Sequence, residues 1–155
     1  MTTGPAVAAL AGLPAGRLVD ARGTSAVAVL GLAGVITGSS LMAFLPGWLG
    51  ASGYVGGLAV LTAGYALFQA ANITSVMAGA GPEHRGVISA LLGLSRNLGL
   101  VTGASAMGAI FSLGSHGLTA LGLSGSAVGL QVTFTVAALL GVVALAITLS
   151  HRRSK

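Results

Sequence analysis

The residues that could do acid–base or metal chemistry are few and scattered. The chain has two carboxylates, Asp20 and Glu83, three histidines, and no cysteine. Both carboxylates fall in predicted loops on one side of a membrane, and the histidines (His84, His116 and His151) fall in three separate loops on its two sides. A Ser–His–Asp site or a metal cluster needs such groups together. No glycine-rich phosphate loop ending in Lys-Ser or Lys-Thr is present. We therefore predict no enzyme, no catalytic or metal site and no cofactor.

Arg96 is the exception, because it lies in the middle of the apolar stretch 85–111 with Asn97 beside it. A helix that starts at Gly86 and rises 1.5 Å per residue places Arg96 about 15 Å deep in a bilayer. The residues on its helix face are all small: Ser89, Gly93, Gly99 and Gly103. Because a lipid-exposed arginine costs at least about 2.5 kcal/mol, this face should contact protein or water. Arg96 and Asn97 are candidate substrate-path residues. The alternative is a buried arginine that ties helices together through carbonyls.

A second polar face lies on the preceding apolar block. Thr62, Tyr65, Gln69 and Asn72 follow the spacing i, i+3, i+7, i+10, which stacks them on one side of a helix. Such a stripe through a membrane helix favours a wet cavity, so Tyr65, Gln69 and Asn72 join the predicted substrate path. The alternative is hydrogen bonding between helices, at about 0.6 kcal/mol per contact.

The elements that carry these residues are membrane spans. The chain is 54% hydrophobic and 6% charged with a mean hydropathy of +0.96, whereas soluble proteins carry about 25% charged residues. Block 1–16 is interrupted by Pro5 and Pro14 and is short for a span, so it is predicted to be a partial transmembrane helix. A signal peptide is the rival interpretation, but no basic residue precedes the block. Four blocks can each cross a hydrocarbon core of about 30 Å: 24–46, 53–79, 86–113 and 128–150.

These blocks predict one all-α transmembrane domain over residues 1–155, a partial helix bundle with the lipid bilayer as its partner. Six of the seven basic residues fall in loop 17–23, loop 83–85 and tail 151–155, and none falls in the alternate loops 47–52 and 114–127. By the positive-inside rule the basic loops and the C-terminus are cytoplasmic, in a multi-pass protein of the cell membrane. Basic residues at block ends do not indicate nucleic acid.

Glycine is abundant, with 26 residues, mostly inside the spans. Small residues four apart let membrane helices approach closely. Three such pairs, Gly34/Gly38, Gly53/Gly57 and Gly99/Gly103, together predict a tight bundle.

Two segments resemble a transporter family. "GRLVDARG" (16–23) is similar to the cytoplasmic loop signature of the major facilitator superfamily, roughly G-x-L-a-D-r-x-G, and departs from it at Ala21, where a basic residue is usual. The matching positions are Gly16, Leu18, Asp20 and Gly23, with Arg22 next to the departure.

The second segment, 81–111, resembles the penultimate-helix region of the fourteen-span drug:proton antiporter branch. The matching residues are Pro82, Arg85, Gly86, Arg96, Gly99, Gly103 and Gly108. The resemblance covers nearly the whole chain and corresponds to the last third of a family member, in the C-terminal half of the fold.

The resemblance implies proton-coupled efflux of drug-like or amphipathic small molecules, by rocking of two six-helix halves. It makes residues 16–23 a conformational gate, and it assigns cytoplasmic-loop and helix-packing roles to Pro82, Arg85, Gly86 and the glycines beyond Arg96. The family's proton-carrying carboxylates commonly lie in other helices. The expected partners are therefore a proton, a small-molecule substrate and a missing N-terminal half, without which the chain is expected to be inactive.

Two alternatives stay open. One is a small stand-alone membrane protein that oligomerises through its glycine faces as a structural or assembly subunit. The other is a half-size transporter that acts as a homodimer.

Overall fold

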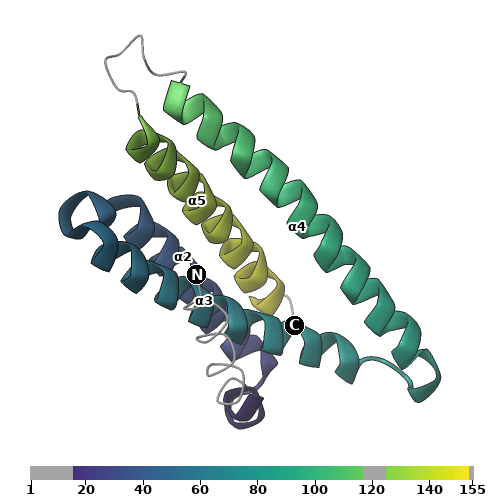
Figure 1. Cartoon of the computed structure of the whole chain (residues 1–155). Coiled ribbons are helices and arrows are strands. Elements are labelled where there is room, and N and C mark those ends of the chain that lie inside the picture. Colours follow the sequence, from purple (N-terminus) through teal and green to yellow (C-terminus); the bar gives the residue numbers. More distant parts are fainter. Residues whose placement is uncertain (1–15, 117–124, 154–155) are drawn as a thin grey trace.

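The computed structural model describes residues 16–116 and 125–153, and every element in these ranges is a helix (Figure 1). Most of the predicted partial helix 1–16 and the last two residues of the tail lie outside them. Residues 16–22 are helical. The longer elements, in chain order, are α2 (Thr24–Phe44), α3 (Pro46–Ala78), the 3-10 helix η1 (Pro82–His84), α4 (Arg85–His116) and α5 (Ser126–Arg153).

Four of these helices are long and apolar enough to cross a membrane, which confirms the predicted number of full spans. Their apolar segments are Thr24–Phe44, Leu49–Ala78, Pro82–Ser115 and Val128–Ser150. Large apolar side chains are exposed along them, for example Leu98, Val101 and Leu139, each at least three-fifths exposed. A surface of this kind suits lipid or further helices rather than water.

The predicted loop 17–23 is helical instead, from residue 16 to residue 22. Its apolar side chains cause this, since Val19 is buried in a cluster with Val27 of α2 and Ala71 of α3, and Leu18 packs against that cluster. The helix ends at Gly23, where φ is 80° and ψ is 155°. Only glycine adopts that conformation readily.

The predicted loop 47–52 is also mostly helical, because Pro46 begins α3 directly after α2 ends. Proline is tolerated in the first turn of a helix, and the backbone N–H of Leu49 donates to the carbonyl of Leu45 at 2.9 Å. The break falls at Gly50, whose φ of 58° and ψ of −134° interrupt the helix. The reversal between the two spans is therefore tighter than the sequence suggested.

Close packing is concentrated in α2, the most buried of the four spans. A Cβ added to Gly57 of α3 would lie 2.7 Å from Met42 Cγ of α2, and one added to Gly141 of α5 would lie 2.8 Å from Ile36 Cγ1 of α2. α5 also packs along α4, where Gly114 and Gly129 lie against each other. α4 touches α3 little, and the two helices diverge from the turn at residues 79–84 (Figure 1).

Hydroxyl side chains inside the spans bond to their own helix. Thr62 donates to the carbonyl of Leu58 at 2.7 Å, and Thr148 donates to the carbonyl of Ala144 at 2.8 Å. This pairing with the carbonyl four residues back satisfies the hydroxyl without water, so these residues are compatible with a lipid environment.

Helix ends gather at two ends of the bundle. Residues 16–22, the 79–84 turn and the end of α5 lie toward one end, and the α2–α3 connection and the start of α5 lie toward the other (Figure 1). The first group contains the basic residues Arg17, Arg22, Arg152 and Arg153, and Arg85 directly follows the turn. The side of the membrane on which this end lies stays a prediction.

Candidate functional site

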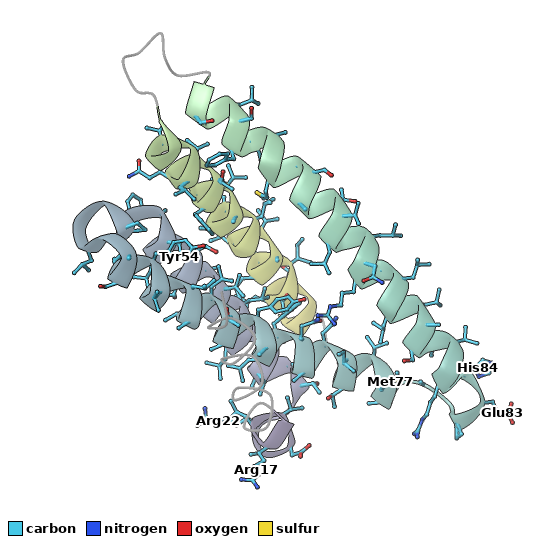
Figure 2. All side chains as sticks on the ribbon, in the orientation of Figure 1. Arg17, Arg22, Tyr54, Met77, Glu83 and His84 are labelled. Atoms are coloured by element: carbon cyan, nitrogen blue, oxygen red, sulfur yellow. The ribbon has the colours of Figure 1, made fainter. Side chains whose placement is uncertain are left out.

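A cavity of about 430 Å³ lies between α3 and α4. α3 contributes Gln69, Asn72, Ile73 and Met77, and α4 contributes Ser89, Leu92, Gly93, Ser95 and Arg96. Figure 2 shows Met77 near the turn end of α3, with Glu83 and His84 on the outer side of the turn. The cavity therefore extends from near the turn into the span.

Each wall of the cavity is one face of a helix, as the spacing of the lining residues shows. Residues 69, 72, 73 and 77 repeat at intervals of three and four along α3, and residues 89, 92, 93 and 96 do the same along α4. Each set forms one face of its helix. The cavity exists because these faces are set apart where the two helices diverge.

Arg96 dominates the electrostatics of this cavity. It is the only charged side chain between residues 86 and 151, and residues 23–82 contain none. It lies eleven residues after Arg85, the first residue of α4, which is about 16 Å along the helix. That is close to the middle of a hydrocarbon core of about 30 Å. In residues 16–116 and 125–153 the guanidinium has no ion pair, and its side chain is exposed.

The structure brings together three of the five predicted substrate-path residues: Arg96, Gln69 and Asn72. Tyr65 does not line the cavity, but its hydroxyl accepts a hydrogen bond from Gln69 Nε2 at 3.0 Å. Asn97 is exposed on α4 and lies outside the lining. The predicted path is thus shorter along α3 than the polar stripe suggested.

The predicted gate residues lie elsewhere. Gly16, Leu18, Asp20 and Arg22 belong to the helix 16–22 and Gly23 ends it, and none of the five lines the cavity. Figure 2 shows Arg17 and Arg22 extending outward from this segment. Asp20 is exposed as well.

Pro82 and Arg85 shape the turn between the two walls. Pro82 begins η1, the backbone N–H of His84 donates to the carbonyl of Gly81 at 3.0 Å, and Arg85 begins α4. The α4 glycines predicted to pack have no neighbour within the described part of the chain, since a Cβ added to any of them would meet nothing within 4 Å. They are Gly86, Gly99, Gly103 and Gly108, together with Gly93 of the cavity wall.

Sequence reasoning missed four lining residues: Ile73, Met77, Leu92 and Ser95. Ile73 and Met77 lie four and eight residues after Gln69, and Leu92 lies four before Arg96, so helical spacing from the polar residues could have found three of them. The apolar side chains of Ile73, Met77 and Leu92 gave no signal by themselves, because many lipid-facing positions carry the same residue types.

The groups that line the cavity can hold a ligand by charge, hydrogen bonds and apolar contact. Within residues 16–116 and 125–153, no three histidine or carboxylate side chains lie close enough to hold a metal ion. The cavity combines one cation, two amides and two hydroxyls with an apolar surface from Ile73, Met77 and Leu92.

Comparison of the chain with protein-family models, curated proteins and solved structures found no match. The fold itself is that of an all-helical chain with four helices able to span a membrane. The chain is therefore a candidate multi-pass membrane protein, and the proposal about its function starts from this class.

Proposed function

We propose that this chain forms one wall of a solute path across a membrane, in a transporter that resembles the C-terminal part of the major facilitator drug:proton antiporters. One observation carries the proposal. The cavity joins Arg96, at mid-membrane depth, to the amides of Gln69 and Asn72 on the neighbouring helix.

The cost of a mid-membrane charge supports a wet path. An arginine facing lipid at this depth costs at least about 2.5 kcal/mol, whereas one facing a water-filled cavity stays hydrated. The cavity volume also falls in the range of small-molecule sites, about 300 to 1,000 Å³. Mixed apolar and polar lining suits amphipathic, drug-like molecules.

Proton coupling enters this proposal from the resemblance alone. The only carboxylates of the chain are Asp20 and Glu83, and neither lines the cavity. In the proposed transporter the proton carriers therefore belong to further helices, and efflux requires them. The open glycine face of α4, with Gly99, Gly103 and Gly108, offers such helices a close-packing surface.

The same open face favours a second candidate, a stand-alone subunit that oligomerises through α4. In that case the chain purified alone would form a defined oligomer in detergent. A half-size transporter would in addition support proton-dependent dye efflux from vesicles that contain only this chain. A monomer in detergent would oppose both alternatives and leave the first proposal.

Cysteine labelling in membrane vesicles tests the solute path, and the native chain has no cysteine to interfere. We expect a water-soluble maleimide to react with Gln69→Cys and Asn72→Cys but not with Leu139→Cys or Val143→Cys on the exposed apolar surface of α5. Glu83→Cys, on the turn, is the positive control for reagent access. If Gln69→Cys and Asn72→Cys stay unreacted while Glu83→Cys reacts, the cavity is dry and the proposal fails.

A further inference from the structure

The cavity between α3 and α4 carries an unbalanced positive charge. Arg96 is the only ionisable group among its nine lining residues, and neither a carboxylate nor an aromatic ring lines it. A guanidinium at this depth is screened weakly, because the surrounding helices are apolar and the effective dielectric constant is below that of water. A ligand of opposite charge gains from this position, and a cation is repelled.

The other polar groups of the cavity can all donate hydrogen bonds. Gln69 and Asn72 have amide NH₂ groups, and Ser89 and Ser95 have hydroxyls. The Gln69 amide is oriented by Tyr65, because Gln69 Nε2 donates a hydrogen bond to the Tyr65 hydroxyl at 3.0 Å. Donors around a guanidinium suit a carboxylate, sulfonate or phosphate, which are acceptors and pair with arginine through two parallel bonds.

The cavity also has an apolar side. Ile73 and Met77 lie on the turn side of Gln69 and Asn72 along α3, and Leu92 lies one helical turn before Arg96 along α4. An apolar body placed there leaves water, while its charged group stays at Arg96.

We infer that this cavity binds amphipathic anions, with the anionic group at Arg96 and the apolar body against Ile73, Met77 and Leu92. The inference rests on the proposed function, in which the cavity is wet, and it names the charge class of the ligand. A dissolved organic anion and the headgroup of an anionic phospholipid share this chemistry, so the experiment separates them.

Three ligands with the same apolar body test the charge preference: naphthalenesulfonate, naphthalenemethanol and naphthylmethylammonium. Each is titrated calorimetrically into the full chain in phosphatidylcholine nanodiscs, with empty nanodiscs subtracted. We expect the sulfonate to bind most tightly. Arg96→Gln should weaken it at least about tenfold, the loss that follows from one charge-assisted hydrogen bond. Arg17→Gln removes an exposed arginine outside the cavity and should leave the affinity within about twofold.

A second variant keeps the inference testable if Arg96→Gln fails to insert. Asn72→Asp changes one atom of the cavity wall and supplies the carboxylate that it does not have. We expect this variant to weaken the sulfonate and to strengthen the ammonium. Similar affinity of the native chain for all three ligands, or sulfonate binding that neither variant changes, would overturn the inference.

Nanodiscs that contain phosphatidylglycerol identify the source of the anion. If lipid headgroups occupy the cavity, the apparent sulfonate affinity falls in these discs for the native chain but not for Arg96→Gln. If it falls for neither, the ligand is a dissolved anion. Reactive Gln69→Cys together with no anion preference would overturn this inference alone, whereas unreactive Gln69→Cys and Asn72→Cys would overturn the proposed function.

Discussion

Gly34 of α2 and Gly64 of α3 face each other so closely that neither position has room for a side chain. A Cβ added to Gly34 would lie 2.8 Å from the Cα of Gly64, and one added to Gly64 would lie 2.6 Å from the carbonyl carbon of Gly34. Because both obstacles are backbone atoms, they cannot move aside as a flexible side chain would. This contact fixes the α2–α3 hairpin and with it the rotation of the α3 face that lines the cavity.

We expect Gly64→Ala to destabilise the chain by about 1 to 3 kcal/mol, the usual cost of overpacking. Gly56→Ala is the matched control, since it lies on the same helix and a Cβ there meets nothing within 4 Å. Equilibrium unfolding in mixed SDS micelles would measure both. Equal stability of the two variants would mean that the α2–α3 contact is looser than described.

Gly23 should be sensitive for a different reason, because its φ of 80° lies where other residues are strained. Gly23→Ala is expected to cost about 1 to 3 kcal/mol in the same unfolding measurement. Gly16→Ala, at a position with open space and helical backbone, should cost less than the Gly23 variant. If Gly16→Ala costs more than Gly23→Ala, the positive φ at the break between residues 16–22 and α2 is not the reason for a glycine at position 23.

A substitution at Gly99 should distinguish the stability of the chain from its association with other helices. A Cβ added at this position meets nothing within 4 Å in the described part of the chain, so Gly99→Leu should change the free energy of unfolding by less than about 0.5 kcal/mol. It should still abolish any association through the glycine face, whether with further helices or with a second copy. Chemical cross-linking, read beside the unfolding curve, checks both parts. Unaltered cross-linking would place the association surface elsewhere.

Membrane orientation can be read from the two ends of α4. Glu83→Cys should react with an impermeant reagent only from the cytoplasmic side, and Ser115→Cys only from the opposite side, because the basic loops are expected to be cytoplasmic. Sealed vesicles of each orientation provide the measurement. Reaction of both cysteines from one side would contradict a single crossing by α4.

The spans and the charge at their centre were predictable because hydropathy is summed over about twenty residues and a lone arginine is conspicuous in such a background. Gln69, Asn72 and Arg96 were placed together because helical spacing alone defines their faces. Tyr65 and Asn97, also predicted for the path, do not line the cavity. The limits of a cavity depend on how far two helices diverge, and no residue of α3 or α4 encodes that angle locally.

The helix at residues 16–22 was not predictable from its charges. Arg17, Asp20 and Arg22 suggested a solvated loop, whereas Val19 is buried against residues from two other helices. Tertiary contacts decided the outcome, as they commonly do for short segments.

α3 and α4 diverge from the 79–84 turn (Figure 1), and every residue that lines the cavity lies in the half of its helix nearer that turn. A substitution within the turn that altered the angle between the two helices would therefore change the width of the cavity without replacing any residue of its lining.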